Sequence, residues 1–287
     1  MGPTRTAAAL LAVLKLSACA KPSDAPPPTS LQLPADHEAP VLRVEHVGGF
    51  VTPEWTLTRL PPFSLYADGR LITQGPVPAV HPGPALPNVL VQSVDAGTVQ
   101  ALVEQALAAG VAETADLGTL DLADVPSTRF TLVTSDGVHV REVHALIQGA
   151  FRGAHDELSV DQRAGRAALR MLEDTLDGLS QQQPWPEGYA ATSVVAIARP
   201  WTAPREPPGR MLARAPVPWP GPPLPGEPVG VQDLGCVTAT GDQAAAVLTV
   251  ARQANGLTRW ETPDGALWSV TFRPLLPDES SCADLLR

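Results

Sequence analysis

Residues 63–72 read Phe63-Ser64-Leu65-Tyr66-Ala67-Asp68-Gly69-Arg70-Leu71-Ile72, an alternation of apolar and polar side chains around an Asp-Gly pair. Alternation with period two is typical of a half-buried strand, and Asp-Gly supplies the positive φ angles of a tight turn. This stretch therefore predicts a β-hairpin. The same dipeptide separates residues 128–134 from 138–146, at Asp136-Gly137, and 260–262 from 266–272, at Asp264-Gly265, which predicts two more hairpins.

Helical patterns follow the first two hairpins. Between Val94 and Gly110, apolar residues share one helical face and Gly110 stands at the position of a C-terminal cap. A second helix is predicted after Ser159-Val160-Asp161-Gln162, which has the spacing of a capping box. With a strand expected at 41–47, the order hairpin-helix-hairpin-helix predicts an α+β domain over 41–183, with helices packed on one face of antiparallel hairpins.

The chain changes character beyond Gln183. Residues 184–234 contain one expected strand, 189–198, and a Pro-dense connection that includes Trp201 and Trp219. Aromatic side chains beside prolines in a long loop can recognise proteins or polymers, so these two tryptophans are a candidate binding surface. Residues 235–287 then predict a small unit of one helix, starting at a second capping-box sequence at Thr240, and the third hairpin.

The N-terminus has the layout of a signal peptide. Arg5 precedes a short apolar run, and Leu16-Ser17-Ala18-Cys19 ends it with small residues before a cysteine. That ending is similar to the lipobox of bacterial lipoproteins. The resemblance implies a signal peptide over 1–18, acyl chains such as palmitate on Cys19, and a lipid-anchored, extracytoplasmic chain at the cell membrane. Residues 19–40 are rich in Pro, Ser, Ala and Asp and predict a flexible tether.

Two cysteines remain, Cys236 and Cys282. In an oxidising compartment an isolated pair most simply forms a disulfide, which we expect to clasp the C-terminal unit. A metal site or a redox couple would call for close Cys-x-x-Cys spacing or neighbouring histidines.

Composition limits the partners. The chain has 20 Lys and Arg against 30 Asp and Glu, and no cluster of cations follows the signal peptide. Nucleic acid is therefore not an expected partner, because its phosphates demand a basic surface. We expect contact with the membrane through the lipid, and with an envelope protein or a wall polymer.

Candidate catalytic and metal-binding groups are dispersed. A zinc site built from Glu142, His144 and a distant third ligand is conceivable, but a solvated sheet face explains both residues better. Asp116, Asp121 and Asp124 lack the order of a calcium loop and fit turns better. No nucleophile elbow and no phosphate-binding loop occurs in the sequence, so we expect no cofactor and name no catalytic residue.

Several segments together resemble uncharacterised secreted lipoproteins of actinobacteria. They are residues 63–70, the helix ending at Ala109-Gly110-Val111, the stretch 124–128, and the terminal Arg273-Pro274-Leu275-Leu276-Pro277-Asp278-Glu279. The resemblance implies location and fold class and carries no activity.

Two functional hypotheses follow. The first is a non-enzymatic binding module of the cell envelope. The alternative is an envelope enzyme or metal-dependent factor, whose site the fold would assemble from dispersed acids and histidines. A concave pocket with convergent titratable groups would favour the enzyme, and an exposed aromatic surface would favour the binding module.

Overall fold

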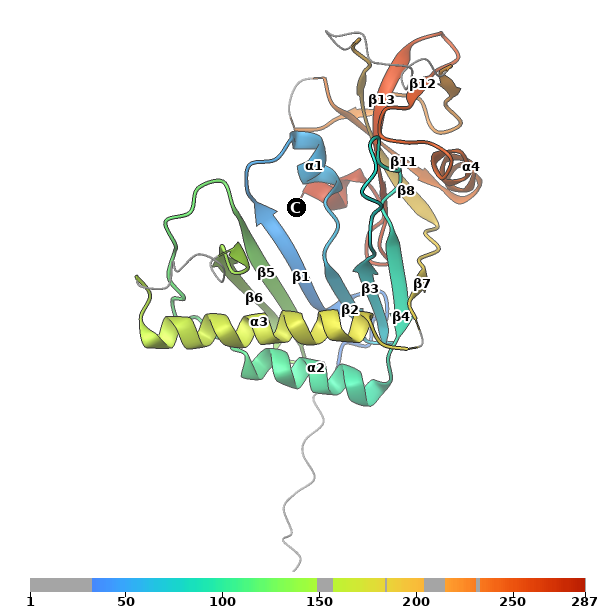
Figure 1. The fold of residues 1–287 in the computed structure, drawn as a ribbon. Helices are drawn as coiled ribbons and strands as arrows, with labels where there is room; N and C mark the ends of the chain where they lie inside the picture. Colours follow the sequence, from blue (N-terminus) through green and yellow to red (C-terminus); the bar gives the residue numbers. More distant parts are fainter. Residues whose placement is uncertain (1–32, 149–156, 184, 204–214, 231–232, 287) are drawn as a thin grey trace, which may run out of the picture. The chain divides into compact units, whose positions relative to one another are not determined.

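Among the residues that the structure describes, the first of two β-sheets has seven strands and carries both long helices on one face (Figure 1). The computed structural model describes residues 33–148, 157–183, 185–203, 215–230 and 233–286, and Leu31–Arg287 belongs to one unit. The strand order is β6-β5-β1-β2-β3-β4-β7. The strands are β1 Pro40–Gly48, β2 Phe63–Tyr66, β3 Arg70–Gln74, β4 Val89–Ser93, β5 Pro126–Thr134, β6 Gly137–His144 and β7 Glu187–Gly188.

Helices α2, Ala96–Ala108, and α3, Val160–Ser180, cover this sheet and bury its apolar face. Asp95 caps α2 by accepting from the Thr98 N–H at 2.9 Å, and the predicted capping box of Ser159 and Gln162 starts α3. The apolar residues of both helices and of β1, β2, β3, β5 and β6 form one cluster, which includes Leu42, Val44, Leu65, Leu71, Val103, Phe130, Leu132, Leu169, Leu172 and Leu176. Because side chains alternate along a strand, the intervening polar residues project from the opposite face.

Within the described ranges, the second sheet has six strands in the order β10-β11-β8-β13-β12-β9. They are β8 Ser193–Pro200, β9 Val217–Pro218, β10 Glu227–Pro228, β11 Gly235–Thr240, β12 Arg259–Glu261 and β13 Leu267–Pro274, with α4 Gly241–Ala251 packed beside them. Strand β8 pairs with both β11 and β13. The strand expected in the connection therefore completes the sheet to which the C-terminal helix and hairpin belong.

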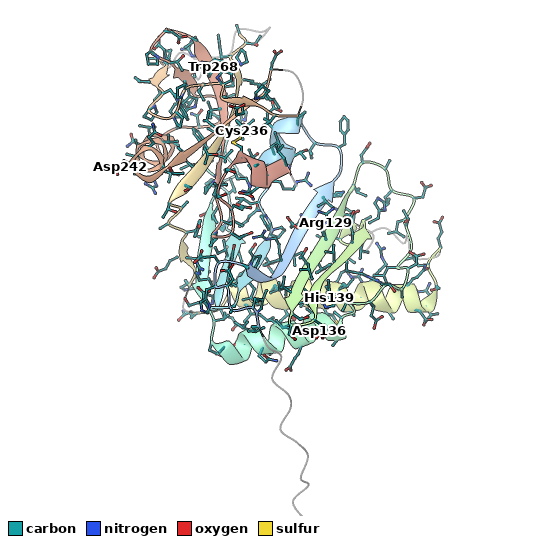
Figure 2. The ribbon with its side chains drawn as sticks, turned by 180° about the vertical axis from the view of Figure 1, so that it is seen from behind. Arg129, Asp136, His139, Cys236, Asp242 and Trp268 are labelled. Atoms are coloured by element: carbon teal, nitrogen blue, oxygen red, sulfur yellow. A yellow bond between two sulfur atoms is a disulfide. The ribbon has the colours of Figure 1, made fainter. Side chains whose placement is uncertain are left out.

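The α+β class and the three hairpins are confirmed. Gly69 has φ +90°, and a Cβ there would overlap the carbonyl of Val94, so the first hairpin needs glycine. In the second hairpin Thr134 pairs with Gly137, so Ser135 and Asp136 form the loop, with Asp136 at its tip (Figure 2). The second predicted capping box is wrong, because the Thr240 side chain makes no capping hydrogen bond.

A short helix, α1 Pro53–Thr58, and a 3-10 helix, η3 Cys282–Leu286, complete the described elements. Thr52 caps α1 by accepting from the Trp55 N–H, and Pro53 occupies its first turn. Within the described residues, no helix is both long enough and apolar enough to cross a membrane.

The predicted disulfide between Cys236 and Cys282 is present. It links β11 to η3 with a Cα–Cα separation of 6.2 Å, across 46 positions of sequence. Cys236 lies on the second sheet, as does Trp268 (Figure 2).

We expect the double substitution Cys236→Ser and Cys282→Ser to lower the free energy of unfolding by about 4 kcal/mol, because the bridge restricts the unfolded chain. Urea unfolding followed by tryptophan fluorescence measures the change. A cost well below about 1 kcal/mol would show that the bridge does not stabilise this fold.

Candidate functional site

Two clefts meet where β1 ends. The polar cleft has a volume of about 520 Å³ and is lined by Arg43, Glu45, Arg129, Arg273, Asp278, Glu279 and Asp284, among other residues. The apolar groove has a volume of about 510 Å³ and is lined mainly by Phe50, Val51, Trp55, Val77, Pro84, Leu86, Pro87 and Phe272. Both volumes lie in the range of small-molecule sites. His46, Gly48, Arg59 and Leu60 line both clefts, so Arg59 stands at their junction.

In the polar cleft, Arg43 is held by Asp278. Arg43 alternates along β1 with the buried Leu42 and Val44, so it projects from the face that the helices leave open. Its Nη2 and Nη1 donate to the two carboxylate oxygens of Asp278 at 2.6 and 2.9 Å, and the Tyr66 hydroxyl donates to the same carboxylate at 2.7 Å. Burial lowers the pKa of Arg43 and Asp278 raises it, with a net upward shift, while burial and Asp278 raise the pKa of Tyr66. The contacts with Asp278 therefore favour the protonated, charged form of Arg43 and the protonated, neutral form of Tyr66.

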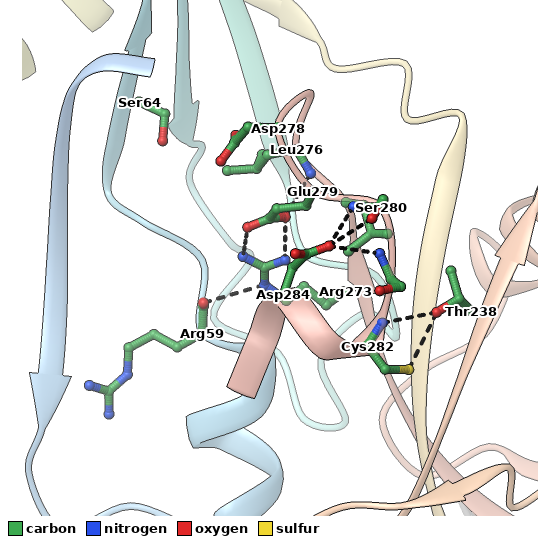
Figure 3. A network of polar contacts seen from close by, with 12 residues as sticks. Arg59, Ser64, Thr238, Arg273, Leu276, Asp278, Glu279, Ser280, Cys282 and Asp284 are labelled. Carbon is green, nitrogen blue, oxygen red and sulfur yellow. Dashed lines mark hydrogen bonds and ion pairs between the residues drawn. The ribbon is translucent and has the colours of Figure 1, made fainter. Parts of the chain in front are cut away.

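A second bidentate pair joins Arg273 to Glu279, the residue that follows Asp278 in the chain (Figure 3). Arg273 donates from Nη1 and Nη2 to Glu279 at 2.5 and 2.7 Å, and its Nε donates to the carbonyl of Arg59 at 3.4 Å. Glu279 also accepts from the N–H of Leu276 at 2.8 Å. The side chains of Arg273 and Glu279 are only 4% and 8% exposed, so this pair is desolvated and each charge depends on the other.

Arg59 lines the polar cleft without an anionic partner among the residues that the structure describes. Its Nη1 donates to the carbonyl oxygens of His46 and Gly48 at 2.8 and 3.0 Å, and its guanidinium points away from Arg273 and Glu279 (Figure 3). Among the described residues it forms no ion pair with a carboxylate. Desolvation lowers the pKa of Arg59. It also lowers the pKa of His46, with a further contribution from the charge of Arg59, and the buried Nε2 of His46 has no hydrogen-bond partner.

The apolar groove exposes large side chains that a monomeric surface usually hides. Phe50, Trp55, Val77 and Val51 are 87%, 55%, 63% and 41% exposed. The backbone at Phe50 is held in place, since Gly48 and Gly49 turn the chain with φ of +69° and +81° and the N–H of Phe50 donates to the carbonyl of Asp124 at 3.2 Å. A cluster of exposed apolar groups around a concavity marks an interaction site. The sequence signal was Gly48-Gly49-Phe50-Val51 before a Pro-initiated helix, and we did not predict a site from it.

Trp201 and Trp219 do not form the predicted exposed surface. Trp219 is 7% exposed and packs edge-on against Trp260 at 5.7 Å between ring centroids, so the prediction of a binding role on the surface is wrong for it. Its indole N–H donates to the carbonyl of Pro222 at 2.6 Å, which satisfies the polar atom and permits burial. Trp201 is partly buried, with the guanidinium of Arg259 5.3 Å from its ring centroid. Cys19 lies outside the described residues.

Two of the residues considered for metals have other partners, whereas the buried Nδ1 of His144 has no hydrogen-bond partner. Glu142 accepts from Arg129 at 3.1 Å across the β5–β6 pair, and the Asp116 carboxylate accepts from the N–H of Gly118 at 2.9 Å within a turn. Arg129 lies on the face of the sheet that α2 and α3 leave uncovered (Figure 2). Within the part of the chain that the structure describes, no group of three or more His, Cys, Asp or Glu side chains is close enough to hold a metal ion.

Glu173 on α3 has a raised pKa and lies outside both clefts. Burial and the neighbouring Asp174 raise its pKa to about 7, against a smaller opposing effect of Arg170. Carboxylates with perturbed pKa values often mark catalytic sites. Glu173 lines neither cleft, however, and the charged groups that act on it, Asp174 and Arg170, belong to its own helix. Its shift therefore reflects local burial.

The comparisons with known proteins give no relatives. No family model matches the chain, no curated protein matches it, and no solved structure matches it.

The buried and exposed ion pairs allow a matched test. Glu279→Gln leaves the desolvated Arg273 without its anion, and we expect the free energy of unfolding to fall by about 3 to 5 kcal/mol. Glu142→Gln breaks the Arg129 pair, whose side chains are 36% and 44% exposed, and should cost less than about 1 kcal/mol. Urea unfolding of both variants measures the difference. Equal costs would contradict the structural role of the buried pair.

Proposed function

We propose that this chain is an extracytoplasmic lipoprotein, anchored to the cell membrane through Cys19, whose folded part binds a component of the cell envelope without transforming it. The apolar groove around Phe50 and Trp55 is the binding site. The observation that carries the proposal is the exposure of these aromatic side chains at the edge of a concavity.

The proposed address is supported by two independent features. The ending Leu16-Ser17-Ala18-Cys19 is similar to a lipobox, and the disulfide between Cys236 and Cys282 is typical of an oxidising compartment. The resemblance to secreted lipoproteins of actinobacteria agrees with both. A lipid on residue 19 would be followed by a Pro-rich stretch that spaces the folded part from the bilayer.

Binding is favoured over catalysis because of how the titratable groups are used. Two acids of the polar cleft, Asp278 and Glu279, are engaged by Arg43 and Arg273 in bidentate pairs. A general base or a nucleophile needs a group that is free to exchange a proton or attack. The groove itself is lined mainly by apolar side chains, which can bury a ligand but offer little chemistry.

The anchor has a direct test. Cys19→Ala should abolish labelling of the protein by radioactive palmitate, because residue 19 supplies the sulfur that carries the acyl chain. The double substitution Cys236→Ser and Cys282→Ser is the control and should keep the label. Label retained on the Cys19→Ala chain would contradict the anchor.

The groove can be tested in the native membrane. A photoreactive amino acid at Val51 should yield one recurrent adduct on illumination, identified by mass spectrometry, because residue 51 lies on the rim of the groove. The same probe at Val140, which is 56% exposed on β6, is the control for non-specific capture.

In the Phe50→Ala, Trp55→Ala background the adduct at residue 51 should disappear, since the aromatic walls are gone. Trp185→Ala, at another exposed tryptophan, should leave it unchanged. No adduct at residue 51, or identical adducts at 51 and 140, would contradict the binding function.

A further inference from the structure

Where the two clefts meet, an apolar groove ends at a positively charged side chain. On one side lie the exposed side chains of Phe50, Trp55 and Val77, and on the other lie the arginines of the polar cleft. Arg59 borders both. A ligand that fills the groove would therefore bring its end to the guanidinium of Arg59.

The remaining arginines of the polar cleft are already neutralised. Arg43 pairs with Asp278, Arg273 with Glu279, and Arg129 with Glu142. Arg59 donates from Nη1 to two carbonyl oxygens and forms no ion pair with a carboxylate among the described residues. A guanidinium has five N–H donors in a planar fork that matches a carboxylate. The site is thus complementary to an anion at this point.

The other charged groups near Arg59 do not replace such an anion. Asp124 lines the groove with an exposed side chain, and Glu45 faces the polar cleft from β1. Glu54, from the helix beside Arg59, pairs with Arg199 at 3.2 Å. Asp284 accepts from the backbone N–H groups of Ser280 and Ser281.

We propose that the groove binds a small amphipathic acid, a single carboxylate on an aliphatic body, with the carboxylate on Arg59 and the apolar body between Phe50, Trp55 and Leu86. This inference rests on the proposed function and names its ligand class. The groove volume of about 510 Å³ suits a ligand of that size and is small for a folded partner. A charge-assisted hydrogen bond is the strongest polar contact available to such a ligand.

The probe is dodecanoate, with its methyl ester as the matched uncharged ligand, titrated by calorimetry below the concentration at which either aggregates. The protein is the full chain with Cys19→Ala, so that no acyl group of its own competes. Dodecanoate should bind about tenfold or more tightly than the ester, because the ester loses the charged hydrogen bond to Arg59.

Variants locate the contact. Arg59→Met should lower the affinity for dodecanoate to that for the ester and leave the affinity for the ester unchanged. Arg59→Lys should still bind the acid more tightly than the ester. Arg252→Met, at an exposed arginine that follows α4 and lines neither cleft, should alter the affinity for neither ligand. Thermal unfolding of each variant verifies that the fold is kept.

Equal affinity for the acid and its ester, a preference for the acid that survives Arg59→Met, or no binding of dodecanoate would each overturn the inference. These outcomes are separable from the proposed function. A recurrent adduct at residue 51 of another chemical kind would keep the groove as a binding site and reject the amphipathic acid.

Discussion

Two consecutive acids, Asp278 and Glu279, hold the two sheets to one short segment of chain. Asp278 pairs with Arg43 on β1 of the first sheet, and Glu279 pairs with Arg273 on β13 of the second. The Tyr189 hydroxyl adds a bond to the carbonyl of Leu275 at 3.0 Å, and the disulfide at Cys282 fastens the same segment to β11. A desolvated pair tolerates little displacement, because a separated buried charge costs several kcal/mol. These contacts hold β1 and β13 in position relative to each other. They thereby position Arg59 and the clefts that lie between the two strands.

The same pairing accounts for the electrostatics of the candidate site. Each acid in the segment pairs with one arginine, and the Nε of Arg273 also donates to the carbonyl of Arg59 at 3.4 Å. The network therefore contacts the backbone of Arg59, whereas the guanidinium of Arg59 takes no part in its ion pairs. The guanidinium itself is held by its hydrogen bonds to the carbonyl oxygens of His46 and Gly48, so less conformational entropy remains to be lost when an anionic ligand binds.

Local signals predicted the elements well and their assembly poorly. The Asp-Gly turns and the cap at Ser159 act over a few residues, so the hairpins and α3 could be predicted. Thr240 has the same spacing, but it ends a strand, and Gly241 follows with φ +55°, so its side chain makes no cap. Trp219 was misjudged because its prolines suggested exposure, whereas a carbonyl three residues away satisfies its N–H in the core. The Arg43–Asp278 pair spans 235 positions, and no sequence pattern indicates it.

The most direct test of the account is a crystal structure of the chain grown with dodecanoate. The account predicts the carboxylate within hydrogen-bond distance of the Arg59 guanidinium and the aliphatic chain against Phe50 and Trp55, with the Arg43–Asp278 and Arg273–Glu279 pairs intact. A carboxylate bound elsewhere, or a groove closed by Phe50 and Trp55 packing into it, would contradict the central claim that the network leaves Arg59 and the groove free for a ligand.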